Sequence, residues 1–100
     1  MVTDTRSFLQ LGTRIPPQDL TAEQALLGAL MIKPRSLMEI TDFLLPDHFY
    51  AEKHRLIYKA MLALDHKAEP IDIVSLTGEL KNNKTLDQVG GASYLAEIIN

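Results

Sequence analysis

The most regular hydrophobic pattern in the chain runs from Glu52 to Asp65, a stretch without glycine or proline. Apolar side chains recur there at helical spacing, at Ile57, Ala60, Met61 and Leu64. Leu56, Leu62 and Ala63 widen this stripe until it nearly encircles the predicted helix. A helix with so little polar surface must be covered on several sides, so we expect the other segments to pack around residues 52–65.

A second amphipathic pattern predicts a helix from about Thr21 to Ile32. Thr21 and Gln24 have the spacing of a capping box, in which each side chain accepts a hydrogen bond from the other residue's amide. The expected apolar stripe comprises Ala22, Ala25, Leu26, Ala29 and Leu30, with Leu27 and Met31 beside it. Gly28 costs about 1 kcal/mol of helix propensity relative to Ala, which indicates that another helix packs close to the backbone there.

The next segment, from Pro34 to about Leu44, is predicted to be a helix that begins at proline and ends before Pro46. Its expected buried face comprises Leu37, Ile40, Phe43 and Leu44. Residues 47–50 are too few for a full helix and predict a single turn. We expect the two aromatic rings of this turn, Phe49 and Tyr50, to close one end of the core.

Two further helices are predicted in the last third of the chain. Asp72 is a suitable N-cap for a helix that continues through Ile73, Leu76 and Leu80. A short turn over residues 85–89 leads to Gly90-Gly91 and to a last helix that starts near Ala92. Its apolar groups are Tyr94, Leu95, Ile98 and Ile99. The predicted fold class is therefore all-α, a compact bundle of about six short helices around the helix at 52–65.

The domain organisation expected from these patterns is simple. Residues 1–18 lack a helical period and end at two prolines, which predicts a flexible N-terminal tail. Residues 19–100 form the helical domain, and 100 residues suffice for one hydrophobic core. The last helix has no stop signal before Asn100, so we expect the sequence to belong to a longer protein.

Charge and composition narrow the functional classes. The net charge is −3 and there is no cysteine, so strong sequence-independent binding to DNA is not expected. No apolar run approaches the roughly 20 residues of a membrane-spanning helix, and no secretion signal is recognisable. We expect a cytoplasmic protein without membrane contact.

Candidate chemistry is sparse. A phosphate-binding loop of the Gly-x-x-x-x-Gly-Lys type is absent, so no nucleotide cofactor is expected in these residues. The three histidines, His48, His54 and His66, lack metal-ligand spacing, and we interpret His54 and His66 as polar groups at the two ends of the central helix. No catalytic residue and no metal site are predicted. An independent enzyme would have to show turnover that one His or carboxylate substitution abolishes.

An alternative from another class remains open at Gly90-Gly91. Amides at a helix start can hold a phosphate, so this turn could belong to a small helical DNA-binding domain. The simpler interpretation is a tight turn between two helices.

Six short motifs, in this order, carry a family resemblance. They are Pro16-Pro17-Gln18, residues 22–28 (AEQALLG), residues 47–50 (DHFY), residues 54–57 (HRLI), residues 70–72 (PID) and residues 89–95 (VGGASYL). Together they resemble the amino-terminal domain of the bacterial replicative DNA helicase of the DnaB type.

This resemblance implies a non-catalytic all-helical head that precedes a helical hairpin and a RecA-like ATPase domain, where ATP and Mg²⁺ would bind. Such heads form a collar on a hexameric ring, and their implied partners are the primase C-terminal domain, helicase loading factors and other helicase subunits. The fragment alone is expected to be a monomer or a weak dimer.

The resemblance also implies roles for matching residues. The residues expected to pack and cap the first helix are Ala22, Glu23, Gln24, Leu26 and Gly28. Those expected to hold the turn against the central helix are Phe49, Tyr50, His54 and Ile57. Asp72 would cap its helix, and Gly90 and Gly91 would make the turn before Tyr94 and Leu95. Tyr94 is the candidate for coupling to partners. The alternative is a tyrosine that fills the core with its hydroxyl at the surface.

Overall fold

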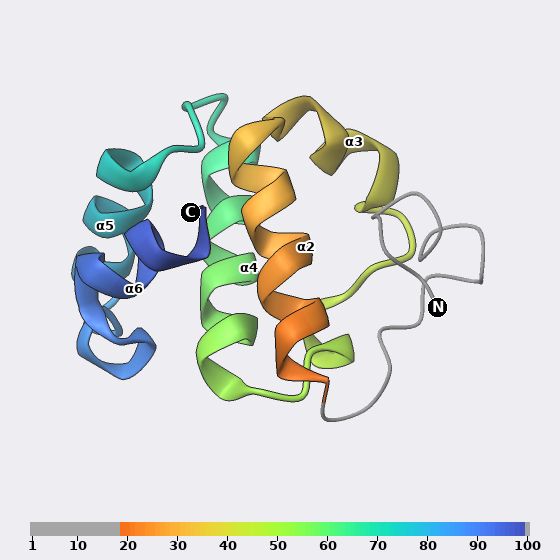
Figure 1. Ribbon diagram of the computed structural model, residues 1–100. Coiled ribbons are helices and arrows are strands. Elements are labelled where there is room, and N and C mark those ends of the chain that lie inside the picture. The colour runs from red at the N-terminus through yellow and green to blue at the C-terminus, as the bar shows by residue number, and fades with distance from the viewer. Residues whose placement is uncertain (1–18, 100) are drawn as a thin grey trace.

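The computed structural model describes residues 19–99, in which all regular structure is helical. Helix α4 (Glu52–His66) lies at the centre, between α2 (Leu20–Ile32) on one side and α5 (Ile73–Asn82) with α6 (Gly91–Ile98) on the other (Figure 1). A short helix, α3 (Leu37–Ile40), and three 3₁₀ turns, Pro34–Ser36, Pro46–His48 and Asp87–Val89, complete the described part. This confirms the all-α prediction, although the predicted tail at 1–18 lies outside the described residues.

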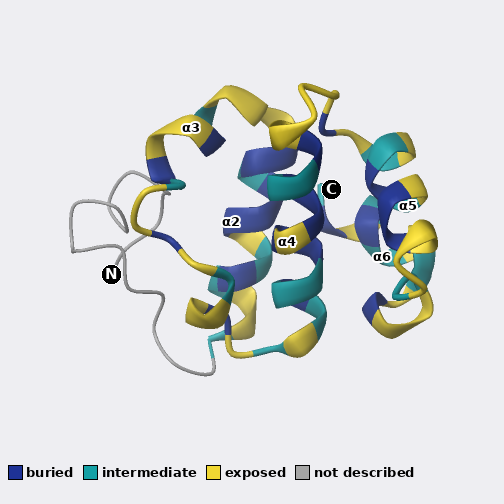
Figure 2. Ribbon diagram, turned by 180° about the vertical axis from the view of Figure 1, so that it is seen from behind, coloured by how far each residue is buried: buried dark blue, intermediate teal, exposed yellow. Residues whose placement is uncertain are grey.

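Helix α4 is buried on several sides, as its sequence pattern predicts. It contacts α2, α5 and the turns at Pro46–His48 and Asp87–Val89. Ile57, Met61 and Leu64 are almost fully buried, and Leu56 and Leu62 pack at the edge of the same core. Buried positions recur along both α2 and α4 (Figure 2). Only one side of α4, which includes Lys59, is open to solvent.

Helix α2 begins one residue earlier than predicted and with a different cap. The side chain of Asp19 accepts a hydrogen bond from the Ala22 amide at 2.9 Å, so the expected Thr21–Gln24 capping box is wrong. The buried face is also rotated from the predicted stripe, since Ala25 is exposed and Glu23 is fully buried. The helix thus directs a carboxylate into the interior.

The predicted helix over 34–44 is wrong in its extent. A 3₁₀ turn at Pro34–Ser36 precedes α3, which ends at Ile40, and Phe43 is 40 % exposed rather than buried. Leu44 still reaches the core, because the Tyr58 hydroxyl of α4 donates a hydrogen bond to the Leu44 carbonyl at 2.7 Å. Because burial removes the Tyr58 hydroxyl from water and disfavours its charged form, it raises the pKa of Tyr58 to about 12. This long-range contact fixes the chain in a turn where local periodicity indicates more helix.

Two glycine predictions are confirmed. A Cβ at Gly28 would lie 2.6 Å from the backbone carbonyl oxygen of Ile98, so α2 and α6 approach at a distance that only glycine permits. Gly90 and Gly91 have φ values of 99° and 73°, in the left-handed region that glycine adopts without strain. They turn the chain from the Asp87–Val89 turn into α6.

At the other end of α4, the structure joins α4 to α5. Asp72 is the N-cap of α5, as predicted, and its carboxylate accepts from the Ser75 amide at 2.8 Å. Lys67, just past α4, pairs with Glu79 of α5 at 2.7 Å. The hydrogen bond to Glu79 is the main cause that raises the pKa of Lys67.

Candidate functional site

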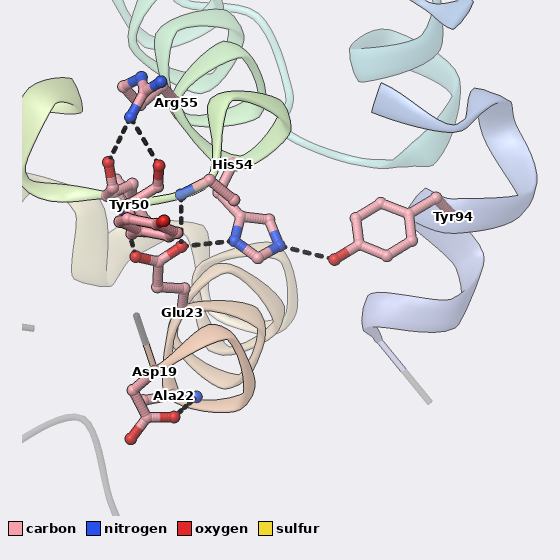
Figure 3. Close-up of polar contacts among 9 residues, drawn as sticks. Asp19, Ala22, Glu23, Tyr50, His54, Arg55 and Tyr94 are labelled. Atoms are coloured by element: carbon pink, nitrogen blue, oxygen red, sulfur yellow. Dashed lines mark hydrogen bonds and ion pairs between the residues drawn. The ribbon is translucent and has the colours of Figure 1, made fainter. Parts of the chain in front are cut away.

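Three polar side chains from three helices meet beside the core. Glu23 of α2, His54 of α4 and Tyr94 of α6 form a hydrogen-bonded chain that we call the polar triad (Figure 3). His54 Nδ1 lies 2.7 Å from a Glu23 carboxylate oxygen, and His54 Nε2 lies 2.6 Å from the Tyr94 hydroxyl. Glu23 is 0 % exposed and His54 is 1 % exposed. His54 lies in the first turn of α4, as predicted, but its ring is in the interior, which the prediction did not include.

The carboxylate of Glu23 also binds the backbone at the start of α4. It accepts hydrogen bonds from the amides of Tyr50 and Ala51, the latter at 3.3 Å. Ala51 is the N-cap residue of α4 and has no side-chain cap of its own. A negative charge at this end is favourable to the helix dipole. Glu23 is thus a capping residue, as expected, but it caps α4 rather than its own helix.

Arg55 holds the same segment from the other side. One guanidinium nitrogen donates to the carbonyls of Phe49 and Tyr50, both at 2.8 Å. The amides of Tyr50 and Ala51 and the carbonyls of Phe49 and Tyr50 are therefore bound by side chains of opposite charge. This arrangement positions the Phe49 ring in the core, 5.3 Å from the Tyr58 ring between centroids. The Tyr50 ring is 56 % exposed, so the prediction that it closes the core is wrong.

The hydrogen-bond directions in the polar triad follow from the donors available. An ionised Glu23 can only accept, so Nδ1 of His54 carries a proton and donates to it. In the neutral imidazole, Nε2 is then an acceptor and the Tyr94 hydroxyl donates. The rings of His54 and Tyr94 are nearly parallel, with an interplanar angle of 17° and centroids 5.9 Å apart. For a neutral imidazole beside an ionised carboxylate, the contacts therefore correspond to one histidine tautomer and one hydroxyl orientation.

Tyr94 lies at the edge of this arrangement. Its ring is half-buried, and the ammonium of Lys53 lies 4.0 Å from the ring centroid. Partial burial, and then the charges of Glu97 and Glu23, raise the pKa of its hydroxyl. The hydroxyl points inward to His54, so the alternative of a core tyrosine with its hydroxyl at the surface is wrong.

The candidate residues of the sequence thus fall into two groups. Glu23, His54 and Tyr94 come together, and the Phe49–Tyr50 backbone joins them through Glu23. Outside this group, the packing, capping and turn positions are Ala22, Leu26, Gly28, Ile57, Asp72, Gly90, Gly91 and Leu95, whereas Gln24 makes no capping contact. Arg55 is not among the predicted site residues, although it belongs to the motif at residues 54–57 and directly follows His54.

The sequence of this domain matches a known protein family. A family model described as the DnaB-like helicase N terminal domain matches residues 15–100. The chain belongs to this family. The replicative DNA helicase DnaC of Bacillus subtilis is 48 % identical over 90 residues, which cover 90 % of this chain and 20 % of the relative. The replicative DNA helicase DnaB of Geobacillus stearothermophilus is 44 % identical over 85 residues, which cover 85 % and 19 %.

Solved structures agree with the DnaB-like assignment. The crystal structure of the N-terminal domain of DnaB helicase from Mycobacterium tuberculosis superposes with a TM-score of 0.79 at 38 % identity. The match covers 85 % of this chain and 59 % of that one. The chain therefore spans between about a tenth and a fifth of the length of the curated relatives it matches.

Two negative findings apply to the described residues. Between residues 19 and 99, none of the helices combines the length and apolarity required to cross a bilayer. Over the same range, no group of three or more His, Asp or Glu side chains converges as a metal site would require.

Proposed function

We propose that this DnaB-like domain is a non-catalytic collar domain, which contributes to assembly of a hexameric helicase and docks primase at the replication fork. The observation that carries this proposal is the family match over residues 15–100. The relatives named as replicative DNA helicases are much longer, since the match covers 20 % of the Bacillus subtilis protein and 10 % of some others. ATP and Mg²⁺ would bind in the part of the helicase that lies beyond this domain.

The distribution of polar and apolar side chains supports a protein-binding role. Glu23 and His54 are buried, and their polar atoms are used to join helices. Large apolar side chains are exposed instead, most strongly Val74 at 81 % and Met38 at 73 %. Protein interfaces depend on apolar anchors more than on a basic surface, which suits a chain with a net charge of −3.

Calorimetric titration with the C-terminal domain of the primase from the same organism tests the docking role. We expect saturable binding by the wild-type domain. Val74→Ser on α5 and Met38→Ser on α3 change exposed positions, so each is expected to keep the fold and to report on its own surface. Loss of binding in one of them would identify the docking face. Absence of binding by the folded wild-type domain would contradict docking by this domain alone.

The alternative of a DNA-binding domain requires backbone amides at Gly90 and Gly91 that are free to donate to a phosphate. The Gly90 amide donates to the Asp87 carbonyl at 3.2 Å, and the Gly91 amide donates to the Leu86 carbonyl at 3.0 Å. Neither glycine amide is therefore free for a phosphate. Titration of labelled single-stranded and double-stranded DNA at low salt tests this directly, because micromolar, salt-sensitive binding would favour the DNA-binding function.

The assembly role is proposed for the longer helicase. The isolated chain is expected to sediment mainly as a monomer, or as a weak dimer, because pairing would also need segments beyond this domain. Sedimentation velocity at tens of micromolar measures this. A stable hexamer of the 100-residue chain would contradict the expectation and would place the whole assembly interface within it.

A further inference from the structure

Helix α6 is attached to the rest of the domain in a way that permits it to move as one piece. It spans only Gly91–Ile98, and the two residues at its start, Gly90 and Gly91, both have positive φ. Glycine pairs of this kind accept large backbone rotations at little cost. An isolated helix of eight residues is not stable in water, so α6 depends on docking for its structure.

Helix α6 docks against α5, α2 and the Asp87–Val89 turn. Leu95 and Ile98 are its buried apolar side chains, and the Ile98 backbone lies directly against Gly28 of α2. The Tyr94 hydroxyl adds a polar contact, because it lies 2.6 Å from His54 Nε2 of α4. Lys53 of α4 covers the outer face of the same tyrosine ring at 4.0 Å. Tyr94 therefore contacts α4 through both its hydroxyl and its ring.

The acceptor for Tyr94 does not depend on α6. His54 is oriented by Glu23 of α2, and Glu23 is held by the backbone amides of Tyr50 and Ala51 (Figure 3). All of these groups belong to α2, α4 and the segment before α4. They would keep their hydrogen bonds if α6 moved away. The imidazole is thus a preformed receptor to which Tyr94 can return.

We propose that α6 is a separately opening unit of the domain, and that the Tyr94–His54 hydrogen bond is the latch that sets how often it opens. Opening occurs by rotation at Gly90 and Gly91. It removes Leu95 and Ile98 from the core and leaves His54 Nε2 to water. The rest of the core, centred on α4, stays folded during this event.

Hydrogen exchange of the 100-residue chain, measured by NMR under conditions where exchange follows the opening equilibrium, tests the proposal. In the wild type, the amides of residues 95–98 should exchange faster than those in the centre of α4. Tyr94→Phe keeps the ring and removes the hydroxyl, so it should raise exchange in α6 by about tenfold, as expected for the loss of one buried hydrogen bond. Exchange in the centre of α4, which requires unfolding of the whole domain, should rise by a similar factor, because the same hydrogen bond is lost in that event as well.

Tyr58→Phe is the matched control, because Tyr58 donates a hydrogen bond from within α4 to the Leu44 carbonyl. That hydrogen bond lies outside α6 and is lost only when the whole domain unfolds. This change should therefore raise exchange in the centre of α4 and leave exchange in α6 close to that of the wild type. Gly91→Ala provides a second variant, since no atom lies within 4 Å of the added Cβ but the φ of 73° is strained for alanine. It should raise α6 exchange about fivefold without touching the polar triad.

Two results would overturn the proposal. If the α6 amides exchange only as slowly as the most protected amides of α4, then α6 opens only with the whole domain. If α6 opens separately but Tyr94→Phe leaves its exchange unchanged while Gly91→Ala raises it, then the helix is mobile and the Tyr94 hydroxyl is not its latch.

Discussion

Replacement of Glu23 by glutamine tests whether the polar triad stabilises the domain. The wild-type carboxylate accepts from two backbone amides and from His54 Nδ1, and it is fully buried. Glutamine keeps the shape but loses the charge, and its NH₂ group is a donor that would face at least one of these three donors. The buried site would then hold an unpaired donor next to another donor.

The expected loss can be worked out from these contacts. Leaving a buried donor unsatisfied costs about 1–3 kcal/mol, and hydrogen bonds to a charged group contribute about 1.5–3 kcal/mol against about 1 kcal/mol for neutral ones. We therefore expect Glu23→Gln to lower the free energy of unfolding by roughly 2–4 kcal/mol. A domain of this size has only about 5–10 kcal/mol in total. The variant should remain folded at 25 °C but with little reserve.

Urea denaturation followed by circular dichroism measures this change. With a slope of about 1 kcal/mol/M, the midpoint should fall by roughly 2–4 M. Glu39→Gln is the matched control, because Glu39 is exposed on α3, and its effect should stay within about 0.5 kcal/mol. A loss below about 0.5 kcal/mol for Glu23→Gln would refute the view that Glu23 caps α4 and orients His54.

Three further predictions concern the core and its packing. Gly28→Ala should destabilise the domain by about 1–3 kcal/mol in thermal melts despite its better helix propensity, because the new Cβ would meet a backbone carbonyl at 2.6 Å; a rise in melting temperature would show that α6 can yield. Ile57→Ala should cost roughly 2–5 kcal/mol in urea titrations, since Ile57 is 0 % exposed; a loss well below 1 kcal/mol would contradict its central position. The pKa of the Tyr58 hydroxyl is raised from 10.0 to about 12. The protonated hydroxyl therefore contributes fully to the free energy of unfolding below pH 10, and this contribution is lost as pH rises toward 12. Urea titrations at a series of fixed pH values measure the fall in the free energy of unfolding between pH 10 and 12, and Tyr58→Phe should make this fall smaller by about 2–3 kcal/mol. An unchanged pH dependence would show that Tyr58 is not the group that causes it.

Much of the fold could be predicted from hydrophobic periodicity, because local pattern and tertiary burial agree in the longer helices. Helix α4 was predicted at 52–65 and lies at Glu52–His66, and the Asp72 cap of α5 is confirmed. Prediction failed between residues 34 and 44, where the Tyr58 hydroxyl binds the Leu44 carbonyl from another helix. No local pattern can reveal a partner fourteen positions away in sequence.

The candidate site shows the same limit more strongly. Motif order placed Glu23, His54 and Tyr94 among the notable residues, but Glu23 and His54 are separated by 31 positions and His54 and Tyr94 by 40. A histidine or glutamate in an amphipathic helix is normally exposed, so burial was not expected of either residue. Only the mutual approach of α2, α4 and α6 shows that each polar group has a partner that makes its burial tolerable.

This burial bears on where function can reside. A buried charge that loses its partner is costly, so Glu23 and His54 cannot turn outward to meet a ligand while the domain keeps its structure. Tyr94 differs, because it is half-buried and belongs to the helix that glycines connect to the rest. Any partner whose binding requires α6 to leave its docked position must break the Tyr94–His54 hydrogen bond. A partner that binds at Val74 or Met38 leaves this bond intact. The effect of Tyr94→Phe on partner affinity would therefore distinguish binding that requires α6 to open from binding to the closed domain.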